Sequence, residues 1–92
     1  DPHFAAAHFN MAVVLEGTGD KRTALQHYRQ AVQIKPDFAA AHNNLGLMLQ
    51  ESGDLEAAIK HFRQALHFHP DYAPAQQNLP SALRALTGTH NF

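Results

Sequence analysis

Residues 37–70 read DFAAAHNNLGLMLQESGDLEAAIKHFRQALHFHP, and much of this stretch repeats the residues that lie 34 positions earlier. The segment FAAAH occupies residues 4–8 and again 38–42, and the dipeptides GD and PD at 19–20 and 36–37 return at 53–54 and 70–71. A period of about 34 residues is typical of helix–turn–helix solenoids. Because one such unit cannot bury its apolar face alone, neighbouring units must stack, and they form an extended surface instead of an enclosed catalytic pocket.

The apolar residues between these dipeptides follow helical spacing. In residues 54–69 they are Leu55, Ala58, Ile59, Phe62, Ala65, Leu66 and Phe68. We therefore predict five helices, near residues 3–17, 20–34, 37–51, 54–68 and 72–86, and a frayed tail over 87–92. The fold class is all-α, and the whole chain, 1–92, forms one domain. Repeat 1 covers about 3–36, repeat 2 about 37–70, and a half-repeat or capping helix about 71–86.

Glycine, aspartate and proline mark the expected helix ends. Gly19 and Gly53 can take the left-handed conformation that closes a helix, and Asp20 and Asp54 can accept hydrogen bonds from the first N–H groups of the next helix. The residue before a proline disfavours helical geometry, so the second helix of each pair ends there. These prolines are Pro36 and Pro70, and the N-cap candidates that follow them are Asp37 and Asp71.

Small residues recur where the two helices of a pair must approach closely. They alternate with two large aromatic side chains, Tyr28 and Phe62, which fill the space between the helices. The small residues are Ala12 and Gly46 in the first helices, and Ala24, Ala58, Ala31 and Ala65 in the second.

Composition limits the classes of partner. The chain has 92 residues, 7 basic and 8 acidic, with a formal charge of −1 and no run of like charge longer than two residues. A nucleic-acid-binding protein normally shows a basic stripe, and no apolar run approaches the ~18–20 residues that span a membrane. We expect neither nucleic acid nor a membrane as partner. The first residues, Asp1 and Pro2, resemble the end of a preceding repeat and predict a piece of a longer protein, whose compartment the sequence leaves open.

Nine spaced positions of each repeat together resemble the tetratricopeptide repeat (TPR) family. The departures from the family pattern are mild: histidine replaces the usual tryptophan, and Met-Ala replaces Leu-Gly in repeat 1. Repeat 2 supplies His42, Leu45, Gly46, Leu49, Gly53, Ala58, Phe62, Ala65 and Pro70, and repeat 1 supplies His8, Met11, Ala12, Leu15, Gly19, Ala24, Tyr28, Ala31 and Pro36. The resemblance implies an antiparallel TPR array of about two and a half repeats, stacked as a right-handed superhelix.

The last predicted helix departs from the pattern at Pro80, which stands where the family has glycine. Proline inside a helix removes one backbone hydrogen bond and clashes with the carbonyl four residues earlier. We predict a kink near residues 76–80, or a helix that restarts there. The second helix of this third repeat is missing from the chain. Its absence predicts an apolar face at Leu79, Leu83 and Leu86 that lacks its usual partner helix, and such a face often marks an interface.

By analogy with the family, the first helix of each pair lines a concave surface that binds a peptide. An amide side chain carries both donor and acceptor, so Asn10, Asn44 and Asn78, which share one register, can pair with a peptide backbone. Repeat 2 looks like the TPR arrays of O-linked N-acetylglucosamine transferase, where such asparagines grip peptide backbone. The alternative is that asparagine is merely common at this position in TPRs. The expected site comprises Phe9, Asn10, Val13, Asn43, Asn44, Leu47, Gln77 and Asn78.

A second binding mode of the family captures the C-terminal carboxylate of chaperones with lysine and arginine. The cationic positions of that clamp are filled by other residues here, so chaperone tails are not the expected ligand. The groove predicts an extended or helical segment with apolar side chains and little net charge. The residues at the clamp positions are Ala6, Phe9, Ala40, Asn43, Pro74 and Gln77.

Eight histidines invite a metal hypothesis. Histidines at equivalent positions of adjacent repeats, such as His8 and His42, lie about 10 Å apart, and zinc requires nitrogens within ~2.1 Å. We expect no metal site, no cofactor and no catalytic residue, because the sequence has neither a phosphate-binding glycine loop nor a nucleophile elbow. Groups that titrate near pH 6.5 predict a stack that weakens on acidification.

Three functional readings follow. The chain is expected to be a protein–protein interaction module, a scaffold or substrate-recruiting part of a larger protein, and not an enzyme. The first alternative is a self-association module, a dimer or helix-swapped pair, that uses Leu79, Leu83 and Leu86. The second is a trimmed or designed folding unit without a ligand.

Overall fold

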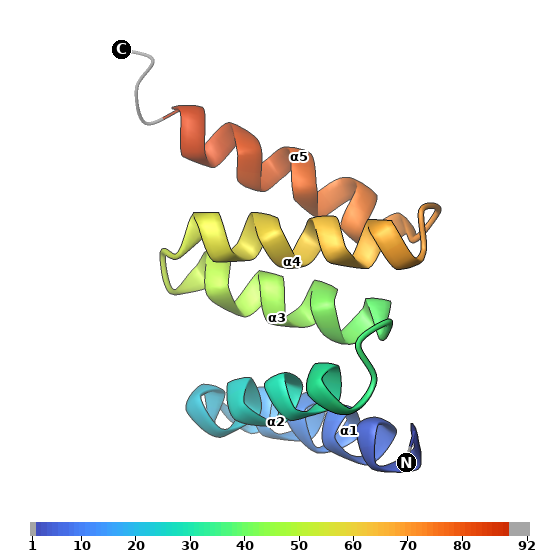
Figure 1. Ribbon diagram of the computed structural model, residues 1–92. Coiled ribbons are helices and arrows are strands. Elements are labelled where there is room, and N and C mark those ends of the chain that lie inside the picture. The colour runs from blue at the N-terminus through green and yellow to red at the C-terminus, as the bar shows by residue number, and fades with distance from the viewer. Residues whose placement is uncertain (1, 89–92) are drawn as a thin grey trace.

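Five helices build the molecule, which is described by a computed structural model over residues 2–88. They are α1 (Pro2–Thr18), α2 (Lys21–Ile34), α3 (Ala39–Glu51), α4 (Leu55–Phe68) and α5 (Ala73–Gly88). Two antiparallel pairs are followed by a fifth helix (Figure 1). The predicted all-α array is confirmed. Of the tail expected to fray, residues 87 and 88 belong to α5, and residues 89–92 lie outside the described part of the chain.

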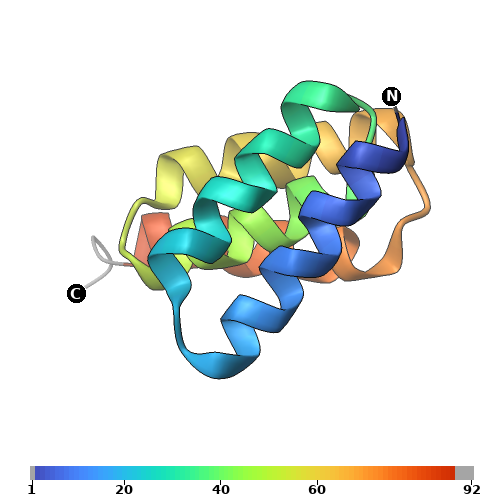
Figure 2. The ribbon, with the colours of Figure 1, turned by 90° about the horizontal axis from the view of Figure 1, so that it is seen from below.

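The helices stack in chain order and make an elongated slab of 47 × 29 × 18 Å. Each helix packs mainly on the helix before and after it, and α3 also contacts α5. Figure 2 shows the α1–α2 pair lying at an angle to the helices behind it. Such a stack buries a continuous core along its length. The central helix α3 is mostly buried, whereas α1 and α5 have many exposed residues.

The two glycine–aspartate turns form as the sequence predicts. Gly19 and Gly53 both have φ of 92°, the left-handed conformation. The following N–H groups then reach back to close the helix, with Asp20 N to Leu15 O and Asp54 N to Leu49 O both at 2.9 Å. Asp20 and Asp54 are N-caps, because their Oδ1 atoms accept from the backbone N–H of residues 23 and 57 at 3.3 and 3.2 Å.

The expected caps at Asp37 and Asp71 are wrong. After each proline the chain makes one further turn, in which Phe38 N donates to Lys35 O and Tyr72 N donates to His69 O, each at 3.0 Å. That turn delays the start of the helix. The residue at the N-cap of α3 is therefore Phe38, whose side chain makes no capping bond, and α5 begins only at Ala73.

The core consists of a few large side chains surrounded by alanines. Tyr28, Leu45 and Phe62 are the largest fully buried side chains. Gly46 shows how close the helices come, since a Cβ atom built there would lie 2.6 Å from Cε1 of Phe62. The predicted alternation of small and large residues is thus present, with Ala12, Ala24 and Ala58 in the same cluster.

Pro80 lies inside α5 without interrupting it. The predicted restart of the helix is wrong, while a bend at this position stays a prediction. Proline has no N–H, so the carbonyl of Gln76 loses its helical partner. Gln76 and Pro80 are both exposed, and water at that surface can replace the lost hydrogen bond.

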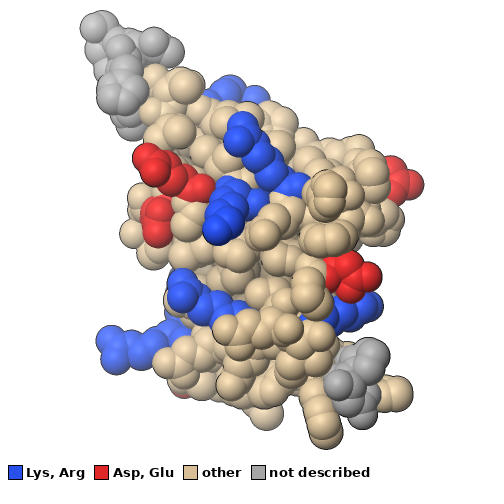
Figure 3. Space-filling model, viewed as in Figure 1, with Lys and Arg blue, Asp and Glu red and all other residues tan. Residues whose placement is uncertain are grey.

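Within residues 2–88, no helix has the length and apolar character needed to cross a membrane. On the face shown in Figure 3, cationic and anionic side chains are interspersed and form no continuous stripe of one sign.

Candidate functional site

The eight residues predicted to bind a peptide lie on α1, α3 and α5, but their exposure differs widely. Val13 and Leu47, one repeat apart, are 45% and 37% exposed. Asn10 and Gln77 are exposed, and Phe9, Asn44 and Asn78 are half-buried. Asn43 is only 2% exposed. Asn43 is therefore buried beneath its more exposed neighbours.

A chain of hydrogen bonds connects α5 to α1 beneath this surface. Asn78 Nδ2 donates to Asn43 Oδ1 at 2.9 Å, and Asn43 Nδ2 donates to Asn44 Oδ1 at 3.4 Å. Asn44 Nδ2 donates to the Tyr28 hydroxyl at 3.3 Å, and that hydroxyl donates to Glu16 Oε1 at 2.6 Å. We call these five residues the amide–tyrosine chain. It joins four of the five helices, which fixes the side chains of the candidate surface relative to one another.

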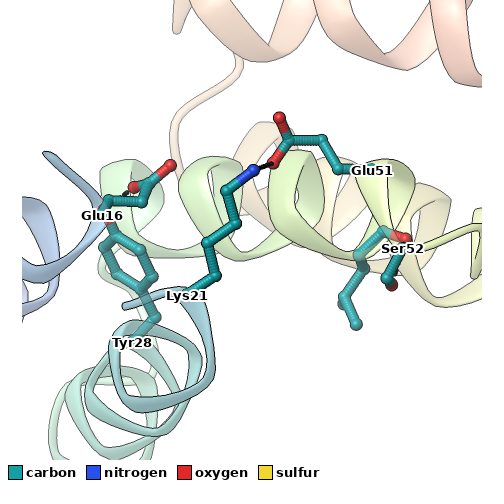
Figure 4. Close-up of polar contacts among 6 residues, drawn as sticks. Glu16, Lys21, Tyr28, Glu51 and Ser52 are labelled. Atoms are coloured by element: carbon teal, nitrogen blue, oxygen red, sulfur yellow. Dashed lines mark hydrogen bonds and ion pairs between the residues drawn. The ribbon is translucent and has the colours of Figure 1, made fainter. Parts of the chain in front are cut away.

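The hydroxyl of Tyr28 links the amides of this chain to Glu16, and Figure 4 shows the tyrosine ring directed at the carboxylate of Glu16. Burial, above all, raises the pKa of Tyr28 far beyond its usual value, and the bond to Glu16 adds to the effect. The hydroxyl therefore stays protonated and acts as donor to the carboxylate. A hydrogen bond to an ionised acceptor is shorter and stronger than one between neutral groups.

Sequence reasoning placed Asn44 and Asn78 on one ladder with Asn10, and the structure changes that arrangement. Asn44 and Asn78 are linked through the buried Asn43. Asn10 is exposed and takes no part in the amide–tyrosine chain. The polar role of Tyr28 was missed, because its position was assigned to packing alone. A signal for it exists: repeat 1 has Tyr28 with Glu16 where repeat 2 has phenylalanine and glutamine.

The amide–tyrosine chain leaves hydrogen-bonding capacity unused. A carboxamide has two donor hydrogens and an oxygen with two lone pairs. Asn44 uses one hydrogen and accepts once, and Asn78 uses one hydrogen toward Asn43. Both side chains are half-buried, so part of each is accessible from the surface.

Phe9 connects the two repeats instead of standing free in the groove. Its ring lies 5.7 Å from that of Tyr28 in an edge-on arrangement and 5.0 Å from that of Phe38. Aromatic pairs at such distances add about 0.5–1.5 kcal/mol beyond the burial of their area. Phe9 is thus half-buried against two other rings, and only part of its surface is exposed.

The leucines expected at a self-association face, Leu79, Leu83 and Leu86, are half-buried and pack against the main hydrophobic cluster. Among the described residues, the two most exposed large apolar side chains lie on α1, where Phe4 and Val14 are 62% and 60% exposed. Their equivalents in repeat 2 are more enclosed: Phe38 is half-buried against Phe9 of repeat 1, and Met48 is 7% exposed.

Each repeat also contains a pair of facing histidines, which sequence reasoning missed. The Nδ1 atoms of His8 and His27 lie 2.9 Å apart, and those of His42 and His61 lie 3.1 Å apart. Both pairs have the same sequence separation of 19 residues, and this shared offset was the available signal. Within residues 2–88, no three or more His, Cys, Asp or Glu side chains form a metal-binding group.

The second pair is the more enclosed. His42 is 4% exposed, and its Nε2 lies 2.8 Å from the carbonyl oxygen of Pro36. Burial lowers the pKa of His42. Burial also lowers the pKa of His61 to about 4, with smaller contributions from His42 and from the cations Lys60 and Arg29. Both rings are therefore neutral at physiological pH, and one donates its Nδ1 proton to the other.

A shallow hollow of about 360 Å³ lies between the start of α2 and the end of α3. Lys21 Nζ and Glu51 Oε1 approach to 3.7 Å beside it (Figure 4), with side chains that are 59% and 58% exposed. Exposed ion pairs contribute little to stability. Ser52, at the edge of the hollow, donates to the backbone oxygen of Leu49 at 2.8 Å and not to a catalytic base.

Comparison with known proteins identifies the repeat type. A family model described as TPR repeat matches residues 18–53, and one described as Tetratricopeptide repeat matches residues 39–72. Together they span 18–72, more than half of the chain. No curated protein matches this sequence.

Among solved structures, the crystal structure of MamA is similar, with a TM-score of 0.85 and 21% sequence identity. The similarity covers 94% of this chain and 50% of that one, so the chain spans about half the length of MamA. At 21% identity, this similarity shows a shared fold and nothing further.

Proposed function

Since this chain belongs to the tetratricopeptide repeat family, a family of protein–protein interaction modules, we propose that it binds an extended peptide segment on the surface formed by α1, α3 and α5. The observation that carries this proposal is that apolar and amide side chains lie close together along this surface. Val13 and Leu47, at equivalent positions of the two repeats, offer exposed apolar surface. The half-buried amides Asn44 and Asn78 lie within about one helical turn of that repeat position.

The spacing suits an extended chain. Equivalent side chains of adjacent repeats lie roughly one helix-packing distance apart, about 10 Å. An extended peptide rises about 3.3 Å per residue, so about every third residue meets an equivalent position. The peptide's backbone would then pair with the amides, while its apolar side chains cover Val13 and Leu47. The resemblance to the asparagine-lined arrays of O-linked N-acetylglucosamine transferase is part of this proposal.

The positions one helical turn beyond Val13 and Leu47 differ in charge along the stack. Glu16, Gln50 and Arg84 share one register, so the surface runs from an anionic end to a cationic end. The Glu16 carboxylate is already held by Tyr28. This arrangement favours a segment with apolar side chains and little net charge, as expected from the absence of the chaperone-tail clamp.

A peptide array followed by fluorescence anisotropy tests the proposal. Asn44→Ala removes the amide and Leu47→Ser removes the apolar contact, while Gln33→Ala on exposed α2 is the matched control. We expect both site variants to bind selected peptides about tenfold more weakly, a loss of about 1.4 kcal/mol, and the control to bind as the parent does. Thermal melts separate lost binding from lost folding. Unchanged affinity in both site variants would exclude this surface.

Self-association through Leu79, Leu83 and Leu86 is the second candidate, and it has less surface to use. These side chains are half-buried against the core, whereas stable interfaces bury about 800 Å² on each partner. Light scattering at two concentrations distinguishes the readings: a constant monomer mass opposes self-association, and a dimer that Leu83→Ser dissociates supports it. A chain that is monomeric and captures no peptide would be a folding unit alone.

A further inference from the structure

The second helices of the two repeats carry most of the cations of this chain. α2 holds three basic residues and no acidic one, and α4 holds two basic residues and one acidic one, although the whole chain has a formal charge of −1. Figure 2 shows α2 and α4 on one side of the slab and α1 and α5 on the other. Lys21 pairs with Glu51. The other cations of these two helices, all exposed, are Arg22, Arg29, Lys60 and Arg63, and we call these four residues the outer basic face.

The four cations of the outer basic face are not neutralised within residues 2–88. The ion pairs of that part of the chain join Lys21 to Glu51 and His69 to Asp71, and neither includes one of the four. Other carboxylates are engaged elsewhere, since Glu16 accepts from Tyr28, and Asp20 and Asp54 cap helices. The outer basic face is therefore available to the carboxylates of a partner.

Two of these cations come from different repeats and lie close to one imidazole. The charges of Arg29 on α2 and Lys60 on α4 both help to lower the pKa of His61, after the larger effects of burial and of His42. An acidic segment that crosses from α2 to α4 would meet both cations. Arginine can bind a carboxylate through two parallel N–H bonds, which adds specificity to the attraction.

A hollow of about 380 Å³ lies along α4 within this face, and basic and apolar side chains line it together. Gln64 Oε1, in the same lining, is buried and has no hydrogen-bond partner within residues 2–88. A buried acceptor without a partner is unfavourable, and a peptide N–H is a donor of the kind that it lacks. The hollow therefore suits a peptide with acidic side chains and an apolar one. Its lining residues are Glu56, Ile59, Lys60, Arg63, Gln64 and His67.

We propose that the outer basic face binds an acidic segment of a partner protein, with Arg29 and Lys60 as the central contacts. This surface shares no residue with the one proposed on α1, α3 and α5, and its ligand differs in charge. Figure 3 looks onto α2 and α4, where basic side chains lie over both helices without forming a continuous stripe. Such separate groups suit a short acidic peptide better than the regularly charged backbone of a nucleic acid.

Fluorescence anisotropy with a labelled glutamate-rich peptide that contains one leucine tests the proposal on the parent chain. The reference peptide has glutamine in place of every glutamate. We expect only the acidic peptide to bind, and its affinity to fall as salt rises from about 0.05 to about 0.3 M, because ions screen exposed charges. Equal binding of both peptides, or no binding of the acidic one, would overturn the proposal. Tighter binding of single-stranded DNA than of the acidic peptide would also overturn it.

Variants locate the contact. Arg29→Gln and Lys60→Gln should each weaken binding by about two- to fivefold, as expected of exposed ion pairs. Glu56→Gln removes the acidic side chain that lines the hollow and should strengthen binding, a gain that lost folding cannot produce. Arg84→Gln removes an exposed cation of α5 and is the matched control, which should bind as the parent does. Unchanged affinity when Arg29→Gln and Lys60→Gln are combined would exclude the outer basic face.

Amide NMR signals of the parent chain locate the bound peptide without any variant. The acidic peptide should shift the signals of α2 and α4, those of Arg29 and Lys60 above all, and leave those of Val13 and Leu47 in place. Shifts centred on Val13 and Leu47 would assign the peptide to the surface of α1, α3 and α5 and contradict this proposal.

Discussion

The hydroxyl of Tyr28 donates a 2.6 Å hydrogen bond to the carboxylate of Glu16, which joins α2 to the end of α1 beneath the candidate peptide surface. Tyr28→Phe removes this bond, and the ring should still fit because Phe62 fills the same place in repeat 2. A bond to a charged group contributes about 1.5–3 kcal/mol. Since Glu16 is half-buried and can be rehydrated, we expect a loss of about 1–2 kcal/mol in urea unfolding. Tyr72→Phe, outside the amide–tyrosine chain, is the control and should change little.

Gly46 and Gly17 form a matched pair for testing the packing of α3 on α4. A Cβ on Gly46 would lie 2.6 Å from Cε1 of the fully buried Phe62, whereas Gly17 has nothing within 4 Å. Gly46→Ala should destabilise the protein by about 1–3 kcal/mol through overpacking, despite the better helix propensity of alanine. Gly17→Ala should stabilise by about 0.5–1 kcal/mol. Thermal unfolding measures both, and a stabilised Gly46→Ala would refute the close contact.

The residues that show why most of the fold could be predicted are Gly19, Gly53, Asp20 and Asp54. Their roles depend on local backbone geometry, which a residue's own chemistry dictates, and all four act as expected. Asp37 failed as a cap because the chain makes a further turn after Pro36, closed by the bond from Phe38 N to Lys35 O, and α3 begins only at Ala39. The proline shows where α2 must end, but it does not tell how many residues separate α2 from α3.

For the candidate site, the sequence predicted which helix faces form the surface, but not which of its residues are buried or bonded to one another. Helical periodicity places Asn43 and Asn44 side by side, but it cannot tell that Asn43 is buried and bonded to Asn78 of α5. That contact depends on the stacking of one repeat on the next. The histidine pairs have the same origin, since His8 meets His27 only after α1 packs on α2.

Acid should destabilise the fold through the enclosed pair His42 and His61. The pKa of His61 falls from 6.5 to about 4 on folding, chiefly through burial, so the unfolded chain binds a proton more readily than the folded one. Stability is therefore full above about pH 6.5 and declines as the pH falls toward 4. Because His61 is only half-buried and solvent screens its charge, we expect a loss of roughly 1–2 kcal/mol.

Urea unfolding at pH 7.5, 6, 5 and 4 measures this dependence. His61→Gln should flatten the part of the profile between pH 6.5 and 4, while His67→Gln, which changes an exposed histidine, should leave it intact. An equally steep profile in His61→Gln would assign the pH dependence to other groups.

The bond between Asn78 and Asn43 should couple the last helix to the preceding repeat. Asn43 is 2% exposed. Its Oδ1 accepts a hydrogen bond from Asn78 Nδ2 at 2.9 Å, and its Nδ2 donates one to Asn44. Asn43→Ala leaves partners unsatisfied and should cost about 1–3 kcal/mol, and Asn78→Ala should cost less because Asn78 is half-buried. Residues in one hydrogen-bond network are not additive, so the double variant should lose less than the sum of the two single losses, by about 0.5–1.5 kcal/mol. Amide exchange along α5 should accelerate in Asn78→Ala before exchange in α3 changes. If the stability losses of the two single variants added strictly in the double variant, or if amide exchange in α5 stayed unaltered, hydrophobic packing alone would hold this helix.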